Sequence, residues 1–364
     1  MREESSRHCV VRIGALLLGL LFVLNGPRAE AYPIAPMTLW ELTLEAELIV
    51  WAEVEAVTTR TFEDYDAYKL SGFEEGVARL RVLEVWKGTA HPDERVEVAY
   101  SPSMNCPAPP RYVQGLPVVA FLTRWNGTWS TVGLSYGTRY PTSNDEAQAY
   151  RRLVELAVKA QAEASPSVPY REDEQALASA PMDWEVLAAS HPATRWDGLF
   201  RLVPSGDVVR DFYVSGVDRS VRLSPAQRET LARGFVAQPP LDRSLPMLLL
   251  PLRGHASAEV DVAAARALET VLMVSGPTRW ALLAFDLLRE RHGERLVARV
   301  IPDEEVVRRA WASAQQGGVG AGSKDVLSLQ EEWRRFKQRR RMTPKLLPLP
   351  VEPTVAGVGG ETPL

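Results

Sequence analysis

The sequence predicts an α+β multidomain protein, in which a small antiparallel β-barrel is followed by an α-helical region. Three observations support this prediction. Apolar residues alternate with period two between Leu48 and Val132. Helical spacing replaces that alternation after Ser143. The chain has 364 residues and ten tryptophans, so it is long enough to bury more than one core.

The N-terminal residues have the pattern of an export signal. An unbroken apolar run, Ile13 to Leu24, follows several arginines and precedes the small-residue site Ala29-Glu30-Ala31. We therefore expect residues 1–31 to be a signal peptide cleaved after Ala31, which makes the mature chain secreted or periplasmic. The run is shorter than the roughly 20 residues that span a bilayer, so a retained membrane anchor is the less favoured alternative.

Charge and cysteine content restrict the partners and the chemistry. The net charge of −4 is mild and gives no indication of nucleic-acid binding. Of the two cysteines, Cys9 and Cys106, only Cys106 remains after cleavage, so the mature chain cannot form an internal disulfide. Cys106 is then either a free thiol or bonded to another molecule.

Five segments between Leu48 and Val132 have strand patterns. In the first, the apolar residues from Val50 to Ala56 alternate with Glu53 and Glu55, which predicts one buried and one exposed face. Five short strands with turn signals between them predict a small barrel or sandwich. The remaining four are expected near residues 78–82, 96–100, 116–122 and 129–132.

A helix is predicted to close the first domain, which we place at residues 32–160. Ser143 and Glu146 form a capping box, and a stripe with helical spacing follows it. Residues 161–181 are polar and interrupted by prolines, as is typical of a linker. The stripe consists of Ala147, Tyr150, Leu153, Val154, Ala157 and Val158.

Residues 182–342 are predicted to form a helical domain. Ser224 and Gln227 make a second capping box around Pro225, and Ser275-Gly276-Pro277 separates two apolar helices. Single apolar stripes on adjacent short helices favour a helical bundle or a HEAT-like stack. Residues 343–364 are rich in proline and glycine, so we expect a disordered tail. The stripes are Val262, Ala265, Leu268 and Leu272; Trp280, Leu283, Leu287 and Leu288; and Leu329, Trp333 and Phe336.

The first domain also resembles a known family. The segments EAELIVWAEVEAV, RVLEVWKG, VEVAY and GLPVVAFL, with Cys106 among them, resemble the netrin-like or TIMP-like modules of secreted bacterial proteins over about residues 37–135. The resemblance implies an OB-fold barrel and an exported protein. Family members that inhibit metalloproteinases present an N-terminal cysteine to the target zinc, whereas the expected mature chain begins with Tyr32-Pro33. Protease inhibition by that mechanism is therefore not implied.

One motif indicates an alternative function. Residues 133–137, Gly-Leu-Ser-Tyr-Gly, match the G-x-S-x-G nucleophile elbow, and His191, His255 or His292 could supply a base to Ser135. No helix is expected directly after Ser135, and the upstream region lacks alternating strands and helices. A glycine-flanked barrel strand is the favoured interpretation, and a secreted serine hydrolase that uses Ser135 is the alternative.

Two other patterns give no cofactor or metal site. Residues 317–324 nearly form a phosphate-binding loop, but they end in Ser323-Lys324 where that chemistry needs lysine before the hydroxyl residue. They also follow an expected helix, 303–315, so we interpret them as an interhelical loop. The five histidines are far apart in the sequence, which gives no paired spacing for a metal.

A basic segment completes the set of candidates. Seven basic residues lie between Arg334 and Lys345, and those from Arg334 to Arg341 could contact an anionic surface. Alternatively, they are cations that complement the dipole at the C-terminal end of a helix. We therefore predict a non-catalytic binding or scaffolding protein, whose partner is a protein or an envelope component. No residue is assigned a catalytic, cofactor or metal role.

Overall fold

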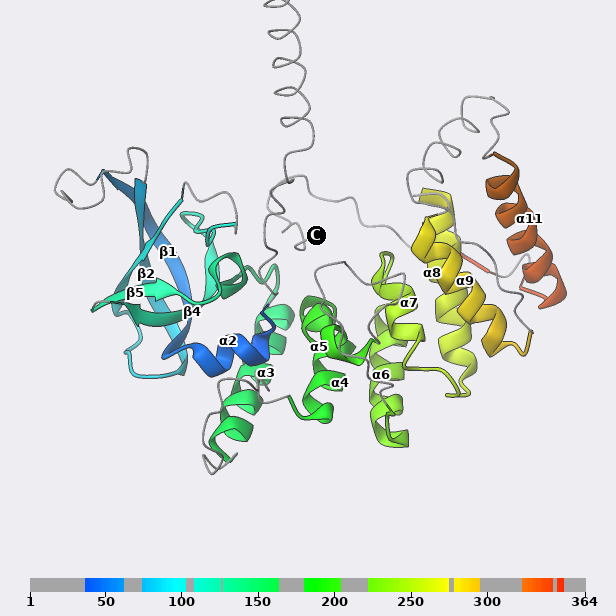
Figure 1. The fold of residues 1–364 in the computed structure, drawn as a ribbon, viewed down its shortest axis with the longest axis horizontal. Helices are drawn as coiled ribbons and strands as arrows, with labels where there is room; N and C mark the ends of the chain where they lie inside the picture. Colours follow the sequence, from blue (N-terminus) through cyan, green and yellow to red (C-terminus); the bar gives the residue numbers. More distant parts are fainter. Residues whose placement is uncertain are drawn as a thin grey trace, which may run out of the picture. The chain divides into compact units, whose positions relative to one another are not determined.

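The structure is a computed structural model of the whole chain (Figure 1). Clustering of contacts separates Met1–Ile34 from a unit that comprises Ala35–Leu364. All residues described below belong to the second unit. They are residues 37–61, 74–102, 108–125, 127–163, 180–203, 222–274, 278–294, 323–342 and 346–349. The expected signal peptide therefore lies outside the described residues.

Five strands form a closed β-barrel, as predicted. Their order is β1-β2-β3-β5-β4, and β4 pairs back with β1. One detail of the prediction is wrong, because β3 and β5 pair in parallel. An odd number of strands cannot alternate in direction around a closed ring, so one neighbouring pair must be parallel. The strands are β1 (Leu48–Thr61), β2 (Glu74–Lys87), β3 (Arg95–Tyr100), β4 (Pro117–Trp125) and β5 (Thr128–Thr131).

The predicted alternation of β1 is confirmed for most of its length. Val50 and Val54 are fully buried in the barrel interior, whereas Glu53 and Glu55 are partly exposed. Ala56 departs from the prediction, since it is only half-buried. The pairing of β1 with β2 shifts register between Val54 and Ala56. Such an irregularity adds a residue to one strand and reverses the faces that follow it.

Two helices cover part of the outer surface of the barrel. Ile49 and Phe121, which point away from the interior, are buried in a cluster with residues of α2 (Leu39–Glu45) and α3 (Asn144–Glu163). One half of the predicted capping box of α3 is confirmed, because the Glu146 backbone N–H donates to Ser143 Oγ at 3.2 Å. The Glu146 carboxylate instead accepts from the Thr142 N–H at 2.6 Å. The same cluster includes Trp184 of α4 (Met182–Ser190). One core thus contains side chains from both sides of the predicted linker.

The later helices share a second core. The predicted capping box is present at the start of α6, where Ser224 Oγ accepts from the Gln227 N–H and the Gln227 side chain accepts from the Ser224 N–H. A 3-10 turn, η2 (Pro192–Thr194), joins α4 to α5. The helices are α5 (Arg195–Leu202), α6 (Pro225–Ala237), α7 (Ser244–Leu249), α8 (Ala258–Val274), α9 (Arg279–Arg291) and α11 (Ser323–Arg339).

One predicted core position on α8 is wrong. Leu268 is buried as expected, but Val262 is 52% exposed. The helix turns by about 100° per residue, so Val262 lies almost opposite Val260 and Ala264, which are buried. The buried face of α8 is therefore centred on Val260 and Ala264, which the predicted stripe did not include.

Part of the expected disordered tail is packed. Within residues 343–364, the structure describes residues 346–349, and Leu346 and Leu349 pack against the core of the later helices. The sequence pattern did not indicate this contact. In the described part of the chain, no helix has both the length and the apolar character needed to cross a membrane.

A close backbone approach joins α4 and α5. A Cβ atom at Gly198 would lie 2.2 Å from the Glu185 carbonyl oxygen and 2.3 Å from the Ala189 nitrogen. Because both contacts are with backbone, no side-chain rotation can relieve them. Glycine is therefore required where these helices cross.

We expect Gly198→Ala to lower the free energy of unfolding by about 2–3 kcal/mol, because overpacking forces the helices apart. Gly254→Ala is the control. Gly254 has a positive φ of 75° but open space around it, so that change should cost only about 1 kcal/mol. Chemical denaturation measures both values, and equal losses would contradict the packing argument.

Candidate functional site

The segment that matches the nucleophile elbow forms a single 3-10 turn. Gly133 and Leu134 both have positive φ, at 62° and 55°, and η1 (Leu134–Gly137) follows. The short strand β6 (Thr138–Arg139) then pairs with β4. A nucleophile elbow leads from a strand into a helix, whereas this turn leads into a strand. The interpretation of these residues as a glycine-flanked strand is therefore wrong, because they form a turn between β5 and β6. The path from turn to strand also differs from the hydrolase alternative.

Packing explains both glycines of the motif. A Cβ atom at Gly137 would lie 1.9 Å from the Val132 carbonyl oxygen. At Gly133, a Cβ atom would lie 2.7 Å from Met37 Sδ and 2.9 Å from Leu42 Cδ2. The motif glycines thus allow the turn to close beneath the N-terminal part of α2.

Ser135 takes part in backbone contacts. Its N–H donates to the Ala108 carbonyl at 3.2 Å, and its carbonyl accepts from Thr138 Oγ1 at 3.4 Å. Among the hydrogen bonds of the described residues, none joins Ser135 to a histidine. His191 is 3.1 Å from Asp145, and His255 is 3.8 Å from Glu229. The structure does not bring these predicted partners together.

Beside this turn, a buried carboxylate connects the barrel to α5. Asp197 is 4% exposed, and its Oδ1 accepts a 2.8 Å hydrogen bond from the Leu39 N–H at the start of α2. The same oxygen is 3.6 Å from the guanidinium of Arg139 on β6. Arg139 also donates to the Tyr136 carbonyl. Asp197 therefore contacts both the N-terminus of α2 and the arginine that follows the glycine motif.

Aromatic contacts strengthen the same junction. The Tyr136 ring stacks on Trp196 with centroids 6.2 Å apart and 12° between the planes. The Tyr150 hydroxyl of α3 donates to the Ala193 carbonyl at 2.7 Å, and Trp184 Nε1 of α4 donates to the Leu153 carbonyl at 2.9 Å. These bonds join residues before and after the predicted linker.

Burial changes the protonation chemistry of this junction. Desolvation raises the pKa of Asp197 from 3.8 to about 6, although Arg139 and the Leu39 N–H both act to lower it. The nearby buried Glu41 adds to the increase. Burial also raises the pKa of Tyr150, which keeps its hydroxyl neutral and able to donate. A strongly perturbed carboxyl group is a feature of functional sites, but buried structural ion pairs show it as well.

A second feature lies at the end of the β4–β5 hairpin, which we define as Arg124, Trp125, Thr128 and Trp129. The Trp125 side chain is 73% exposed. Arg124 lies over the Trp129 ring, with its guanidinium carbon 4.6 Å from the ring centroid. Trp125 pairs with Thr128 at the last position of the ladder. A large indole is therefore presented at the turn.

Glu47 holds this hairpin end in place. Its Oε1 accepts from the Arg124 N–H and from Thr123 Oγ1, each at 2.9 Å. These two hydrogen bonds lower the pKa of Glu47. Trp125 was not among the residues predicted to be functional. In the sequence, Trp125 directly precedes the turn signal Asn126-Gly127. An apolar side chain at the end of a strand has few barrel residues to pack against, and this position could have indicated its exposure.

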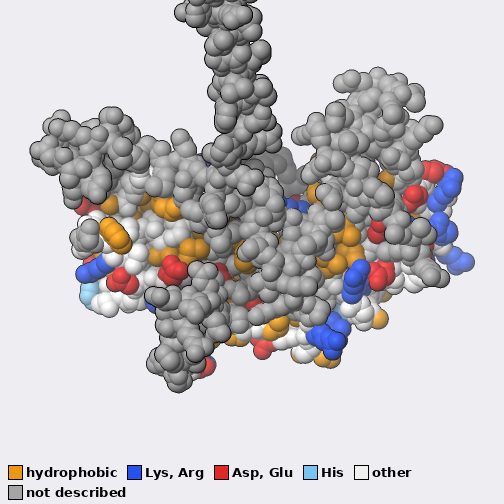
Figure 2. All heavy atoms as spheres, viewed as in Figure 1, with side chains coloured by type: hydrophobic (Ala, Val, Ile, Leu, Met, Phe, Trp, Pro, Cys, Tyr) orange, Lys and Arg blue, Asp and Glu red, His pale blue; other side chains and the backbone are white. Residues whose placement is uncertain are grey.

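The basic candidates on α11 have partners inside the molecule. Figure 2 shows Lys and Arg side chains gathered where Figure 1 places α11, with carboxylates beside them. Arg334 and Arg335 each lie 2.7 Å from Glu331, and Lys337 lies 2.6 Å from Glu269 of α8. Much of the positive charge expected to face an anionic surface is thus paired with carboxylates.

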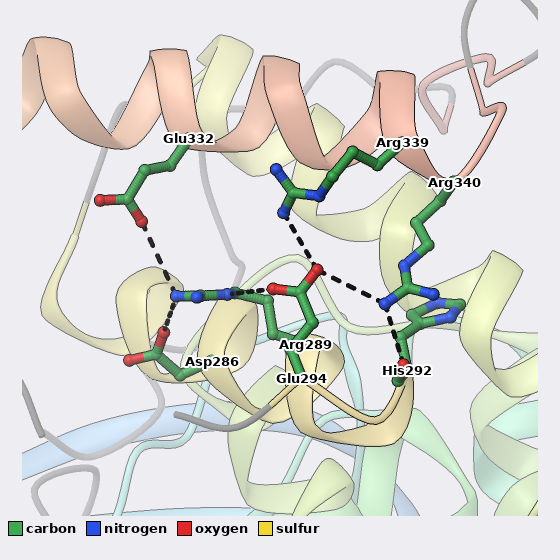
Figure 3. A network of polar contacts seen from close by, with 7 residues as sticks. All are labelled: Asp286, Arg289, His292, Glu294, Glu332, Arg339 and Arg340. Carbon is green, nitrogen blue, oxygen red and sulfur yellow. Dashed lines mark hydrogen bonds and ion pairs between the residues drawn. The ribbon is translucent and has the colours of Figure 1, made fainter. Parts of the chain in front are cut away.

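Arg339 and Arg340 belong to a network that joins α11 to the end of α9 (Figure 3). Glu294 accepts from Arg339 at 3.0 Å and from Arg289 at 2.9 Å, and the Arg340 guanidinium donates to the His292 carbonyl at 2.9 Å. The arginines lower the pKa of Glu294 against the effect of its burial. This network has the character of a structural contact between helices.

The remaining sequence candidates provide no site. Cys106 and residues 317–322 of the glycine-rich loop lie outside the described residues, as does the helix expected at 303–315. Within the described ranges, no group of three or more histidine, cysteine, aspartate or glutamate side chains could hold a metal ion.

Comparisons with known proteins do not place the chain in a family. No family model matches the sequence, and no curated protein matches it. The resemblance to netrin-like modules therefore stays a prediction, and the function has to be argued from the geometry.

Asp197 should make stability depend on pH. Because its folded-state pKa is raised, its contribution is fully present below pH 4 and is lost as the pH rises through about 6. Relative to Asp197→Asn, which cannot ionise, the wild-type free energy of unfolding should fall by about 2 kcal/mol between pH 4 and 7. Urea denaturation at several pH values measures this difference. Glu155→Gln, which changes an exposed carboxylate and keeps Asp197, is the control and should retain the pH dependence of the wild type.

Proposed function

We propose that this protein is an exported, non-catalytic binding or scaffolding protein that contacts its partner through the end of the β4–β5 hairpin. The observation that carries the proposal is the 73% exposure of Trp125 on a turn that Glu47 holds in place. Tryptophan and arginine are the residues that most often dominate binding interfaces. Arg124 and Trp129 contact each other at the same end of the hairpin, and the ladder places them on the face opposite Trp125.

The barrel topology supports an OB-type assignment. A closed five-stranded barrel with a crossover between β3 and β4 agrees with the five-stranded Greek-key barrel of OB-folds, which bind ligands at loops that include the one between strands four and five. The resemblance of residues 37–135 to netrin-like modules supports the same fold. A bundle or HEAT-like arrangement of the later helices stays a prediction. The apolar run before Ala31 supports export to the periplasm or the exterior.

The partner chemistry follows from the exposed groups. A protein or an envelope component that presents a planar or apolar group to Trp125, and a hydrogen-bond acceptor to Arg124, would match the hairpin end. The alternative, a serine hydrolase that uses Ser135, has less support, because the backbone of Ser135 is hydrogen-bonded to Ala108 and Thr138.

We expect Trp125→Ala to weaken partner binding at least tenfold, since truncation removes the exposed contact area of the indole. Biolayer interferometry against a panel of envelope oligosaccharides and purified envelope proteins measures the affinity. Leu156→Ala is the matched control, because Leu156 is an exposed apolar residue on α3 away from the hairpin. Equal effects of the two variants would contradict the proposed contact site.

A fluorophosphonate probe separates binding from catalysis. Wild-type protein and Ser135→Ala should both remain unlabelled if the protein is not a hydrolase. Labelling of the wild type that disappears in Ser135→Ala would overturn the proposal and establish an activated serine.

A further inference from the structure

The C-terminal segment Leu346–Leu349 contacts α8 through two hydrogen bonds. Arg266 Nε donates to the Leu347 carbonyl at 3.0 Å, and the Leu349 N–H donates to Thr270 Oγ1 at 2.7 Å. Thr270 in turn donates to the Arg266 carbonyl at 3.0 Å. Two side chains of one helix thus bind backbone groups of the segment, which is a contact that does not require a particular side-chain sequence.

Two residues of this segment that are three positions apart are partly buried. Leu346 and Leu349 pack on the helical core, whereas Leu347 and Pro348 are exposed, Leu347 by 67%. A polyproline II helix has three residues per turn and places residues i and i+3 on the same side. Proline at 348 also disfavours helical geometry at Leu347.

The end of α11 directs the chain back to α8. Arg341 has a positive φ of 55°, and the Met342 N–H donates to the Lys337 carbonyl at 2.9 Å. This is the bonding of a helix C-terminal Schellman motif. The Leu346 N–H then donates to the Met342 carbonyl at 2.7 Å. A defined cap thus ends α11 before the docked segment.

The segment leaves apolar surface uncovered on the same side of α8. Val262 is 52% exposed, Met273 65% and Val274 63%. Val262, Arg266, Thr270 and Met273 follow the i, i+4, i+8, i+11 spacing of one helical face. The contacts with Arg266 and Thr270 therefore lie between exposed apolar residues at the two ends of the helix. We call this surface, Val262, Arg266, Thr270, Met273 and Val274, the α8 face.

We propose that the α8 face is a docking site for an extended, proline-containing peptide of a partner protein with leucines three residues apart, and that Leu346–Leu349 occupies it in cis. The cis segment defines the chemistry of the ligand, because it shows which groups α8 binds. A longer partner peptide gains contacts with Val262 and Met273 that the segment does not use. The site is separate from the hairpin end and does not depend on the function proposed there.

The short connection from α11 gives the cis segment a high effective concentration, in the millimolar range for short linkers. It therefore competes with any free peptide, and weakening the cis contact should expose the site. The probe is a fluorescein-labelled peptide with the sequence KLLPLPV, and the readout is fluorescence anisotropy with the full chain.

We expect the peptide to bind Leu346→Ser/Leu349→Ser at least tenfold more tightly than wild type, because the leucines no longer hold the segment in cis. Adding Thr270→Val to this variant should weaken binding about fivefold, through loss of one hydrogen bond to the peptide. Thr230→Val is the matched control, since Thr230 also donates to a carbonyl one turn earlier, at 3.1 Å, but on α6. A peptide with serine in place of the leucines that correspond to Leu346 and Leu349 should not bind.

The proposal is overturned if the peptide binds the double variant no more tightly than wild type, or if Thr270→Val and Thr230→Val have equal effects. Circular dichroism checks that the variants fold. If the double variant does not fold, Leu349→Ala alone provides the same comparison, because it keeps Leu346 in the core. Trp125→Ala should leave peptide binding unchanged, which distinguishes this site from the hairpin end.

Discussion

The burial of the Asp197 carboxylate is the constraint on which the arrangement of the barrel and the adjoining helices depends. A buried carboxyl group is costly unless it is hydrogen-bonded or paired. Here the Leu39 N–H and Arg139 offset part of that cost, and they come from α2 and β6. The start of α2, the strand after the glycine motif and α5 must therefore meet at one place. The stacking of Tyr136 on Trp196 adds an apolar contact at the same junction.

This constraint also gives a structural role to the most suggestive motif in the sequence. The glycines that would make a nucleophile elbow instead permit close approach to Val132 and to α2. Tyr136 provides its carbonyl to Arg139 and its ring to Trp196. Residues that resemble a catalytic motif thus connect the barrel to the helices. At the hairpin end, by contrast, Trp125 is exposed, and Glu47 binds the neighbouring Thr123 and Arg124.

Charge has a comparable role in the later helices. Two basic residues of α11 form ion pairs with carboxylates of other helices. Lys337 pairs with Glu269 of α8, and Arg339 pairs with Glu294 at the end of α9. Pairs with partly buried members depend on geometry more than exposed pairs do. The positive charge near the C-terminus therefore orients α11, and the turn after α11 leads the chain onto α8. Helix docking and the position of Leu346–Leu349 are consequences of the same local sequence.

The sequence by itself determined the elements whose signals are local. Period-two alternation marked the strands, the capping boxes at Ser143 and Ser224 marked two helix starts, and apolar spacing identified Leu329, Trp333 and Phe336 as core residues. These signals are local because hydrogen-bonding and side-chain direction repeat within a few residues. The bulge that turns Ala56 out of the interior was not predictable, since it depends on register with a second strand.

Only the tertiary structure decided which residues meet across long separations. Asp197 and Leu39 are 158 positions apart, and no pattern near either residue encodes their contact. The same holds for Thr270 and Leu349, for Glu294 and Arg339, and for the parallel pairing of β3 with β5. Burial, pKa and exposure arise from everything that packs around a side chain. The glycine motif around Ser135 therefore suggests a catalytic role from the sequence alone. Only the folded chain shows that Asp197 is buried and that Trp125 is exposed.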